Sequence, residues 1–378
     1  MNNIIVLGAG MVGSAMAIDL AKKHQVLLTD LNPSVLEKFK DINNNIKTMQ
    51  LDVTDDEALT STLSKFDLVL SAVPGFLGYR TLEKIINQEK NVVDISFFPE
   101  NALDLNKLAI EKDVTAIVDC GVAPGMDNVI LGHYNETHEL SSFECLVGGL
   151  PKEKKWPFCY KAPFSPIDVI EEYTRPARYV ENGNLITRPP LTDCEFIEFE
   201  KVGTLEAFNS DGLRSIIFTM PHIKDRKEKT LRYPGHVEYV RVLKDSGFFS
   251  NEKVEGFNIS PIDFTSKILF KEWKLNPDEE EFTVMRVTLV GLNNKREKEQ
   301  ITYDLFDEYC NDTQTSSMAR TTGYTATAAV NLFLEGLFDE KGVFPPELVG
   351  KNPDCFNYFI KYLKERNVHY KKTVKKLN

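Results

Sequence analysis

Apolar runs alternate regularly with amphipathic stretches over the first 125 residues of the chain. Each apolar run has the length of a buried strand, and stretches with helical spacing separate the runs. The six runs are residues 3–7, 25–29, 46–53, 68–73, 91–95 and 115–118. Strands that alternate with helices form parallel sheets through right-handed crossovers. This pattern therefore predicts an α/β fold with a Rossmann doubly wound parallel sheet.

The pattern changes after residue 125. Short alternating runs, interrupted by proline and glycine, predict strands at 143–147, 194–200, 215–219 and 282–290. They indicate a second α+β domain with a mixed, largely antiparallel sheet. Residues 318–337 have the periodicity of one long helix. We therefore expect a first domain over 1–125, a second over 126–317, and a C-terminal helical segment over 318–378 that packs back on the first domain.

Composition and charge narrow the possible functions. The 378 residues carry a formal charge of −11, and an acidic surface repels phosphate backbones, so we expect no nucleic-acid partner. No apolar run has the length of a membrane span, and no apolar leader precedes the first strand, so we expect a cytoplasmic protein without a membrane partner. The six cysteines lack the spacing of a zinc site, so we expect no metal and a reducing compartment. The lysine-rich tail over 371–376 is interpreted as a solvated helix end.

A glycine-rich segment directly follows the first predicted strand and opens the first predicted helix. Its residues are Gly8, Ala9, Gly10, Met11, Val12 and Gly13. Gly8 permits a tight turn, Gly10 lets the backbone approach a pyrophosphate, and Gly13 lets the helix pack closely on the strand. The N-terminus of a helix also offers free N–H groups to phosphates. In this strand–turn–helix context, the segment predicts a dinucleotide site that includes Met11 and Val12.

Residues at the ends of later strands complete the predicted cofactor site. Asp30 ends the second strand, where an acid accepts hydrogen bonds from the adenosine ribose. A 2′-phosphate would meet a like charge there, and no arginine follows immediately, so we expect NAD rather than NADP. Asp52 is a candidate partner of the adenine amino group. Ala72 and Val73 end the fourth strand and Pro74 follows it, at the edge where open α/β sheets bind ligands.

Nine motifs, spread in order over nearly the whole chain, carry a resemblance to a known family. They are 119–128 (DCGVAPGMDN), 148–151 (GGLP), 164–166 (FSP), 172–177 (EYTRPA), 180–183 (VENG), 203–208 (GTLEAF), 229–236 (KTLRYPGH), 318–324 (MARTTGY) and 342–347 (GVFPPE). In these motifs the chain resembles the saccharopine dehydrogenase-like superfamily, and its L-lysine 6-dehydrogenase branch looks closest. The resemblance implies a Rossmann domain, a substrate-binding domain that also dimerises, and oxidation of an amine by NAD(P). As a departure, residues 95–100 (ISFFPE) stand where lysine 6-dehydrogenases carry a Gly-Gly-His run.

Two aspartates and a cysteine of the first domain are candidates for the chemistry. Asp94 and Asp119 each end an apolar strand, where a carboxylate could hold a cationic amine and act as a base. The bracing of a loop is the alternative for both. Cys120 is interpreted as a packing contact near the nicotinamide and substrate, because hydride transfer needs no nucleophile.

Basic residues of the second domain are further candidates. His236 suits proton transfer near neutral pH, with the bracing of a turn as the alternative. Arg214 and Arg232 are candidate clamps for an amino-acid carboxylate, because a guanidinium can bind a carboxylate through two hydrogen bonds. A salt bridge is the alternative for each. Arg175 and Arg178 could supply a second clamp.

The glycine-rich segment and Asp30 predict an NAD-dependent dehydrogenase, and the resemblance implies oxidation of an amine, specifically oxidative deamination of the L-lysine 6-amino group. One alternative is a saccharopine dehydrogenase that acts on a lysine-derived secondary amine. Another is a catalytically idle NAD-binding regulatory protein, because a fold does not guarantee activity. We expect a small-molecule amino-acid substrate and, from the resemblance, a homodimer.

Overall fold

The computed structural model describes residues 1–39, 42–164, 166–276 and 279–378, which form two compact units. Unit 1 consists of Met1–Glu139 and Met318–His369, and unit 2 of Leu140–Ser317 and Tyr370–Asn378. Ser165 of the motif at 164–166 lies outside the described residues. The first boundary falls after Glu139 and not after residue 125, because helix α6 (Met126–Asn135) belongs to unit 1.

The close packing of α6 explains this shift of the boundary. Helix α6 approaches α12 (Pro346–Gly350) so closely that a Cβ on Gly132 would lie 2.0 Å from the carbonyl oxygen of Glu347. The Asn128 side chain also donates to the Glu347 carboxylate at 2.7 Å. The C-terminal segment thus holds α6 in unit 1.

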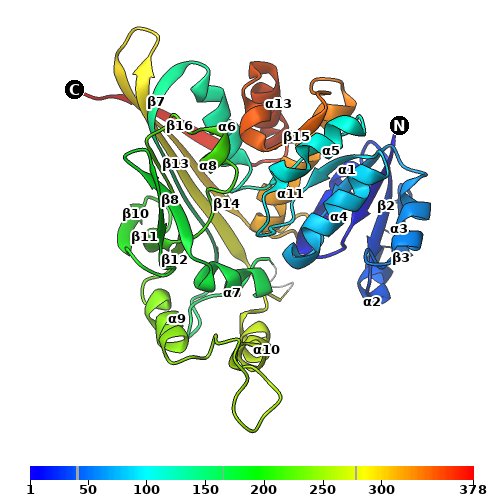
Figure 1. The fold of residues 1–378 in the computed structure, drawn as a ribbon, viewed down its shortest axis with the longest axis horizontal. Coiled ribbons are helices and arrows are strands. Elements are labelled where there is room, and N and C mark those ends of the chain that lie inside the picture. Colours follow the sequence, from blue (N-terminus) through cyan, green and yellow to red (C-terminus); the bar gives the residue numbers. More distant parts are fainter. Residues whose placement is uncertain (40–41, 165, 277–278) are drawn as a thin grey trace. The chain divides into compact units, whose positions relative to one another are not determined.

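Unit 1 contains a seven-stranded parallel sheet with the order β15-β6-β5-β4-β1-β2-β3 (Figure 1). Its strands are β1 (Asn3–Leu7), β2 (Gln25–Asp30), β3 (Ile46–Gln50), β4 (Leu68–Ser71), β5 (Asn91–Asp94), β6 (Thr115–Ile117) and β15 (Gly342–Phe344). The first six strands lie where the apolar runs predict them. The strand order reverses beside β1, so the doubly wound sheet is confirmed. The sequence pattern does not predict β15, because β15 lies outside the alternation of strands and helices and joins β6 from the C-terminal part of the chain.

Helices connect these strands and cover the sheet. They are α1 (Met11–Leu20), α2 (Pro33–Leu36), α3 (Asp56–Leu63), α4 (Gly75–Asn87) and α5 (Asn106–Glu111), with α11 (Ser317–Leu334), α12 and α13 (Pro353–Lys364) later in the chain. Helix α3 begins where Asp55 accepts hydrogen bonds from the backbone N–H groups of Glu57 and Ala58. Buried aliphatic side chains of the strands and of α4, among them Val69 and Leu82, form the core beside this sheet.

Unit 2 is built on a mixed sheet, whose main path has the order β10-β11-β12-β7-β13-β14-β16. The strands are β7 (His138–Pro151), β8 (Ala177–Glu181), β9 (Asn184–Arg188), β10 (Glu195–Phe199), β11 (Gly203–Asn209), β12 (Asp225–Arg232), β13 (Glu281–Asn293), β14 (Lys298–Glu308) and β16 (Tyr370–Lys376). Strands β7 and β12 pair in parallel, whereas β10–β11, β11–β12, β13–β14 and β14–β16 are antiparallel. The expected mixed, largely antiparallel sheet is confirmed.

The expected strand at 215–219 is wrong, because residues Ile216–Thr219 form the short helix α8. Arg226 of β12 donates from Nη1 to the carbonyl oxygens of Ile216 and Met220, at 2.7 and 2.6 Å. This buried guanidinium satisfies carbonyl groups at the end of the helix. A tertiary contact therefore overrides the strand preference of the apolar run.

The interpretation of the lysine-rich tail as a helix end is also wrong. Helix α13 ends at Lys364, and the tail forms strand β16, which pairs with β14 so that Lys371 faces Asp304 and Lys372 faces Tyr303. Because β16 lies at the edge of its sheet, its exposed lysines disfavour pairing with a further strand.

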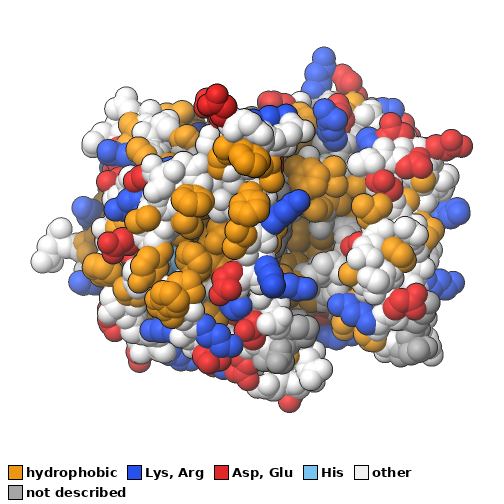
Figure 2. All heavy atoms as spheres, turned by 90° about the horizontal axis from the view of Figure 1, so that it is seen from below, with side chains coloured by type: hydrophobic (Ala, Val, Ile, Leu, Met, Phe, Trp, Pro, Cys, Tyr) orange, Lys and Arg blue, Asp and Glu red, His pale blue; other side chains and the backbone are white. Residues whose placement is uncertain are grey.

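The remaining helices of unit 2 carry several exposed hydrophobic side chains. These helices are α7 (Pro166–Thr174), α9 (His236–Asp245) and α10 (Pro261–Trp273). Exposed residues include Tyr239 and Val242 of α9 and Phe264 and Ile268 of α10. Figure 2 is turned by 90° from Figure 1 and shows the protein from below. Hydrophobic side chains gather on the surface seen in this view. Among the described residues, no helix has both the length and the apolar character needed to cross a bilayer.

Candidate functional site

The glycine-rich loop between β1 and α1 has the steric features of a phosphate cradle. Gly8 has a φ of +103°, and a Cβ at this position would lie 2.5 Å from the carbonyl oxygen of Ala72. A Cβ on Gly13 would lie only 2.0 Å from the carbonyl oxygen of Gly8. Both positions therefore require glycine. A Cβ on Gly10, in contrast, would meet open space, which leaves room for a ligand at the backbone.

The first turn of α1 is suited to an anion. Gly10 precedes the helix without a side-chain cap, and the first turn contains no acidic residue. The first N–H groups of a helix have no acceptor within it and carry partial positive charge. Met11 is 41% exposed and Val12 is half-buried in this turn. The loop and the helix thus fit the pyrophosphate of a dinucleotide.

Asp30 lies beside this loop, whereas Asp52 makes a local turn. The Asp30 carboxylate accepts from the backbone N–H groups of Ala9 and Asn32, at 2.8 and 2.9 Å. It therefore braces the loop at the end of β2, where a ribose is expected. Asp52 accepts from the backbone N–H and the hydroxyl of Thr54, at 2.8 and 2.6 Å, and the contact of Asp52 with adenine stays a prediction.

The residues expected after β4 lie against the cradle. The backbone of Ala72 approaches Gly8, and the Ala72 Cβ would lie 3.5 Å from a Cβ on Gly13. Val73 is 7% exposed, and Pro74 precedes the first residue of α4. The structure thus brings the turn after β4 next to the glycine-rich loop, and the contact of these residues with a cofactor stays a prediction.

Asp94, at the end of β5, is fully buried and titrates near neutral pH. Burial raises the pKa of Asp94 to about 7, and the charge of Asp119 acts in the same direction. Its carboxyl oxygens accept from the backbone N–H and the hydroxyl of Ser96, at 2.9 and 3.0 Å. A carboxyl group with such a pKa can take or give a proton at neutral pH. Asp94 therefore braces a loop and keeps the properties of an acid–base group.

The sequence analysis does not identify Ser96 as the hydrogen-bond partner of Asp94, although the local sequence contains a signal for this contact. An aspartate followed two residues later by serine is typical of a turn in which the side chain accepts from the backbone. The order Asp94, Ile95, Ser96 has this form.

Asp119 and Cys120 follow β6 in a turn alongside Asp94. Asp119 has a φ of +52°, in the left-handed region that few residues other than glycine adopt, and is 5% exposed. The Cys120 N–H donates to the carbonyl oxygen of Asp94 at 3.1 Å, so the turn lies next to the end of β5. The thiol lies 3.9 Å from the Thr325 carbonyl oxygen, and burial raises the pKa of Cys120. A protonated, buried thiol agrees with packing and not with nucleophilic chemistry.

In unit 2, Arg232 and His236 belong to one buried hydrogen-bonded network. The Arg232 Nε donates to the Tyr173 hydroxyl at 3.0 Å, and this hydroxyl lies 2.9 Å from His236 Nε2. His236 Nδ1 lies 3.0 Å from the Phe158 carbonyl oxygen, so Nδ1 carries the proton and Nε2 accepts from Tyr173. Burial lowers the pKa of His236 to about 3. These contacts favour the bracing of a turn over proton transfer for His236.

The charge of Arg232 is already matched inside unit 2. Its Nη2 donates to Glu172 at 2.8 Å, and its guanidinium lies 4.4 Å from the centre of the Tyr160 ring. Arg232 is only 2% exposed. A buried guanidinium with a carboxylate partner favours the salt-bridge alternative over a substrate clamp. Sequence reasoning misses Glu172 because it lies 60 positions away and no local pattern links the two.

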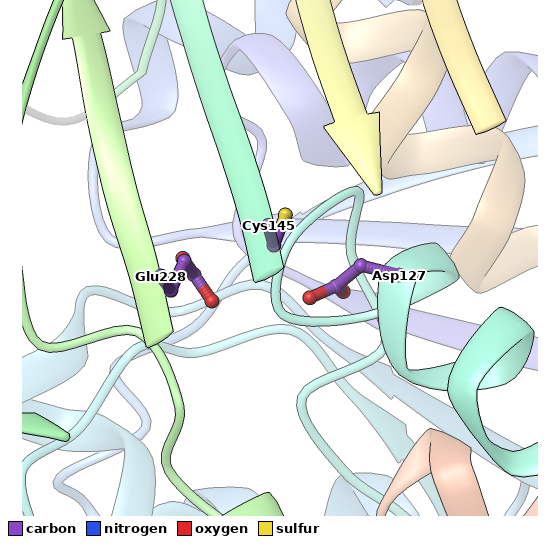
Figure 3. Close-up of side chains that lie close together, drawn as sticks. All are labelled: Asp127, Cys145 and Glu228. Atoms are coloured by element: carbon purple, nitrogen blue, oxygen red, sulfur yellow. The ribbon is translucent and has the colours of Figure 1, made fainter. Parts of the chain in front are cut away.

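Arg214 has the more unusual environment of the two candidate clamps. It lies between β11 and α8, is 6% exposed and has a φ of +42°. Two residues earlier, a Cβ on Gly212 would lie 1.9 Å from a carboxylate oxygen of Glu228. Figure 3 shows Glu228 on β12 and Cys145 on β7, which are partners in the register of these strands. A buried arginine in a rarely adopted backbone conformation is a reasonable candidate for a functional residue.

Arg175 and Arg178 make local ion pairs. Arg178 donates from Nε and Nη2 to the two oxygens of Asp211, both at 2.9 Å. Arg175 pairs with Glu171, one turn earlier on α7. The guanidinium fork of Arg178 is therefore engaged by a protein carboxylate, which disfavours a second substrate clamp at this pair.

Two family models match successive parts of the chain. The saccharopine dehydrogenase NADP binding domain matches residues 4–117, and the saccharopine dehydrogenase C-terminal domain matches residues 121–368. The chain belongs to the saccharopine dehydrogenase family. The resemblance in the nine sequence motifs is therefore confirmed at the level of the superfamily.

Relatives of this family share sequence and fold with the chain. Saccharopine dehydrogenase (NADP(+), L-glutamate-forming) from Pyricularia oryzae is 25% identical over 266 residues, which cover 66% of this chain and 59% of that protein. The enzyme of the same name from Saccharomyces cerevisiae is 26% identical over 273 residues, which cover 68% of this chain and 60% of that protein. The chain thus spans about 60% of the length of these curated relatives.

A solved structure supports the assignment of the fold. Apo saccharopine dehydrogenase (L-Glu forming) from Saccharomyces cerevisiae superposes with a TM-score of 0.81 at 20% identity, and the match covers 99% of this chain and 100% of that chain. The relatives named here are saccharopine dehydrogenases. They do not support the expectation that the L-lysine 6-dehydrogenase branch is closest.

Proposed function

We propose that this protein is an NAD(P)-dependent oxidoreductase that acts on the secondary amine of saccharopine or of a close lysine-derived conjugate. The observation that carries the proposal is the match of two saccharopine dehydrogenase domains over residues 4–117 and 121–368. The open backbone at Gly10 supports the cofactor. Because the relatives are named L-glutamate-forming, a conjugate of lysine and glutamate is favoured over free lysine.

The proposed reaction needs few catalytic groups from the protein. A bound nicotinamide supplies the acceptor for a hydride from the carbon that bears the nitrogen. The substrate is left as an iminium, and addition of water followed by C–N cleavage gives an amine and a carbonyl compound. The N-terminus of α1 would hold the pyrophosphate and Asp30 the ribose. Asp94, whose pKa burial raises to about 7, would take the proton that is released as water adds.

We propose NAD as the preferred cofactor, with NADP as the alternative. Asp30 would repel a 2′-phosphate, and the next residues, Leu31, Asn32 and Pro33, carry no positive charge. The family model and the fungal relatives nevertheless carry NADP in their names, so both must be titrated. We expect tighter binding of NADH than of NADPH, and a smaller difference in Asp30→Ala. Equal or tighter binding of NADPH to the wild type would contradict the preference.

A substrate panel tests the proposed reaction. Saccharopine, L-lysine and ornithine are each incubated with NAD⁺ and with NADP⁺, and the reduced nicotinamide is followed by absorbance. Formation of glutamate from saccharopine supports the proposal. Release of ammonia from L-lysine would instead favour the lysine 6-dehydrogenase reaction. Tight dinucleotide binding without any turnover would favour the idle regulatory alternative.

We further propose that the protein is a cytoplasmic homodimer. The resemblance to the family supports dimerisation. Light scattering of the purified protein measures its mass in solution, and a monomer at micromolar concentration would contradict the dimer.

A further inference from the structure

Large apolar side chains are exposed at one end of unit 2, on α9, on α10 and on the chain between them. The two helices pack against one hydrophobic core, through Val240 of α9 and Leu269 of α10. Each helix nevertheless carries further apolar side chains that this core does not cover. The exposed residues are Val242, Phe248, Val254, Phe257, Phe264 and Ile268, which are 44–69% exposed. We call these six residues the helical face.

The chain between the helices holds the helical face together. The N–H of Phe248 donates to the carbonyl oxygen of Leu243 in α9 at 3.0 Å, and the N–H of Ile262 in α10 donates to that of Ser250 at 3.1 Å. Phe249 packs into the same core as both helices. Helices α9 and α10 lie at the bottom of Figure 1, and the view from below in Figure 2 shows hydrophobic side chains gathered there. The helical face is therefore a single surface of unit 2.

The helical face has the size of a protein–protein interface. A large aromatic side chain buries about 150–250 Å² when it is covered, so six large side chains that are about half exposed offer roughly 600 Å². A stable interface takes about 800 Å² from each partner, and polar side chains at the rim supply part of this area. Three of the six residues are phenylalanines, and aromatic side chains are enriched in interfaces. Apolar surfaces of this size are typical of binding sites.

The charges around the helical face favour a second copy of the chain as its partner. Residues 236–274, which contain the helical face, carry six acidic and six basic side chains, whereas the whole chain has a formal charge of −11. Two acidic molecules repel each other least where their surfaces are neutral. A strongly charged partner finds no complementary net charge on this surface. At the edge of the unit 2 sheet, the exposed lysines of β16 disfavour an alternative interface between strands.

The order of charges along α10 favours an antiparallel contact between two copies. Asp263 lies in the first turn of α10 and Lys271 in its last turn, and the exposed Phe264 and Ile268 lie between them. When α10 of a second copy runs in the opposite direction, Asp263 approaches Lys271 of that copy, and Phe264 approaches Ile268. Such self-complementary pairing is typical of two-fold dimers.

We propose that the helical face is the interface of a homodimer, in which α10 packs antiparallel on α10 of a second copy about a two-fold axis. The apolar side chains are removed from water, and the opposite charges at the rim set the direction of the contact. This interface rests on the proposed homodimer but not on the proposed reaction.

Charged substitutions on α10 test this interface. Light scattering measures the mass of the wild type, of the double variant Phe264→Glu, Ile268→Glu, and of Leu185→Glu. Leu185 of β9 is 57% exposed and is the matched control. Strand β9 pairs with β8, which meets β12 near its start at Arg226, whereas α9 follows the other end of β12. We expect the double variant to raise the dissociation constant of the dimer at least about hundredfold, because it removes two central apolar contacts, and Leu185→Glu to leave it unchanged.

Cross-linking locates the two-fold axis independently. Lys267 is exposed and lies between Phe264 and Ile268 along α10. Lys267→Cys should therefore give a covalent dimer with a short bismaleimide. Leu185→Cys should give no more cross-linking than the wild type, whose own cysteines set the background. Helicity measured by circular dichroism should stay unchanged in every variant, because all the substituted side chains are exposed.

Each outcome supports or overturns the interface. A double variant that stays dimeric, or a Lys267→Cys variant that does not cross-link, overturns the helical face as the interface. Binding of the wild type to phosphatidylcholine vesicles that the double variant loses would identify a lipid surface as the partner in place of a second copy. Assemblies that grow beyond a dimer with concentration overturn the two-fold arrangement. A monomeric wild type would contradict the proposed homodimer itself, whereas a dimeric wild type confines any failure to this interface.

Discussion

At the scale of single residues, Asp94 shows how burial turns a loop-bracing side chain into an acid–base group. The sequence places it at the end of a strand, where ligands bind. Its pKa near 7 depends on full burial and on the neighbouring Asp119. Neither feature is visible in the local sequence.

The pH dependence of stability tests this environment. Because burial raises the pKa of Asp94 from 3.8 to about 7, the folded state favours the protonated form. The stabilisation of the folded state by protonated Asp94 is fully present below about pH 4 and is lost as the pH rises through 7. Asparagine stays neutral, so the thermal midpoint of Asp94→Asn should rise relative to that of the wild type between pH 4 and 8. A constant difference over this range would contradict the raised pKa.

The same substitution should lower turnover. Asparagine keeps the shape of Asp94 but cannot take a proton. We expect turnover of the accepted substrate to fall at least about tenfold, within the range that general acid–base groups contribute. Unchanged turnover with normal dinucleotide affinity would leave Asp94 with a bracing role alone.

Tyr173 is a residue whose importance the sequence does not reveal. Tyr173→Phe would leave the Nε–H of Arg232 without its acceptor and His236 Nε2 without its donor. Losing partners for buried polar groups costs about 1–3 kcal/mol each, so we expect a clear decrease in the free energy of unfolding in urea. Tyr239→Phe, at an exposed tyrosine of α9, is the control and should have no measurable effect. Equal stabilities of the two variants would show that the network contributes little.

At the scale of elements, the sequence patterns predict the segments that alternate regularly over the first 125 residues and fail for two short segments outside this alternation. The six strands over 1–125 and the helix that begins near residue 318 have clear periodicities. In contrast, β15 and α8 contain three and four residues, and each depends on a distant partner. β15 pairs with β6, and Arg226 stabilises α8.

Removal of β16 tests its place in the unit 2 sheet. A chain that ends at His369 would expose the edge of β14 that now pairs with residues 370–376. We expect faster amide hydrogen exchange in β14 and a greater tendency to aggregate, because an unpaired strand edge recruits other strands. A chain that lacks only Asn378 is the control. Unchanged protection of β14 in the shorter chain would contradict a stabilising role for β16.

At the scale of the whole molecule, unit 1 is assembled from both ends of the chain. Asp19 of α1 is 2% exposed and accepts from Arg366 at 2.9 and 2.8 Å. The hydroxyls of Thr327 and Tyr362 also donate to it, at 2.7 and 2.8 Å. One buried carboxylate thus joins the N-terminal helix to two segments that lie more than 300 positions later.

Breaking this ion pair should destabilise the protein strongly. Arg366→Met removes the buried cation beside Asp19 and leaves the carboxylate with Lys22, an exposed lysine at 3.0 Å. Breaking a buried ion pair typically costs about 3–5 kcal/mol. Although burial opposes it, the Arg366 guanidinium holds the pKa of Asp19 below its usual value, so the stabilisation is present at neutral pH and is lost as the pH falls through the lowered pKa. Urea denaturation at pH 7 should therefore show a larger loss than at acidic pH. The double variant Asp19→Asn, Arg366→Met should recover part of the stability, and no recovery would contradict the ion pair as the cause.

By itself, the sequence determined the Rossmann sheet, the glycine-rich loop, and which residues lie at the carboxyl ends of β2 and β4. These features follow from periodicity and turn chemistry, which act over a few neighbouring residues. Only the tertiary structure decided what the charged residues do. His236 and Arg232 became parts of a buried network, and Arg178 became a partner of Asp211, because their partners lie 33 to 78 positions away in the sequence. Burial, pKa and pairing are properties of such distant neighbours, and no local pattern encodes them.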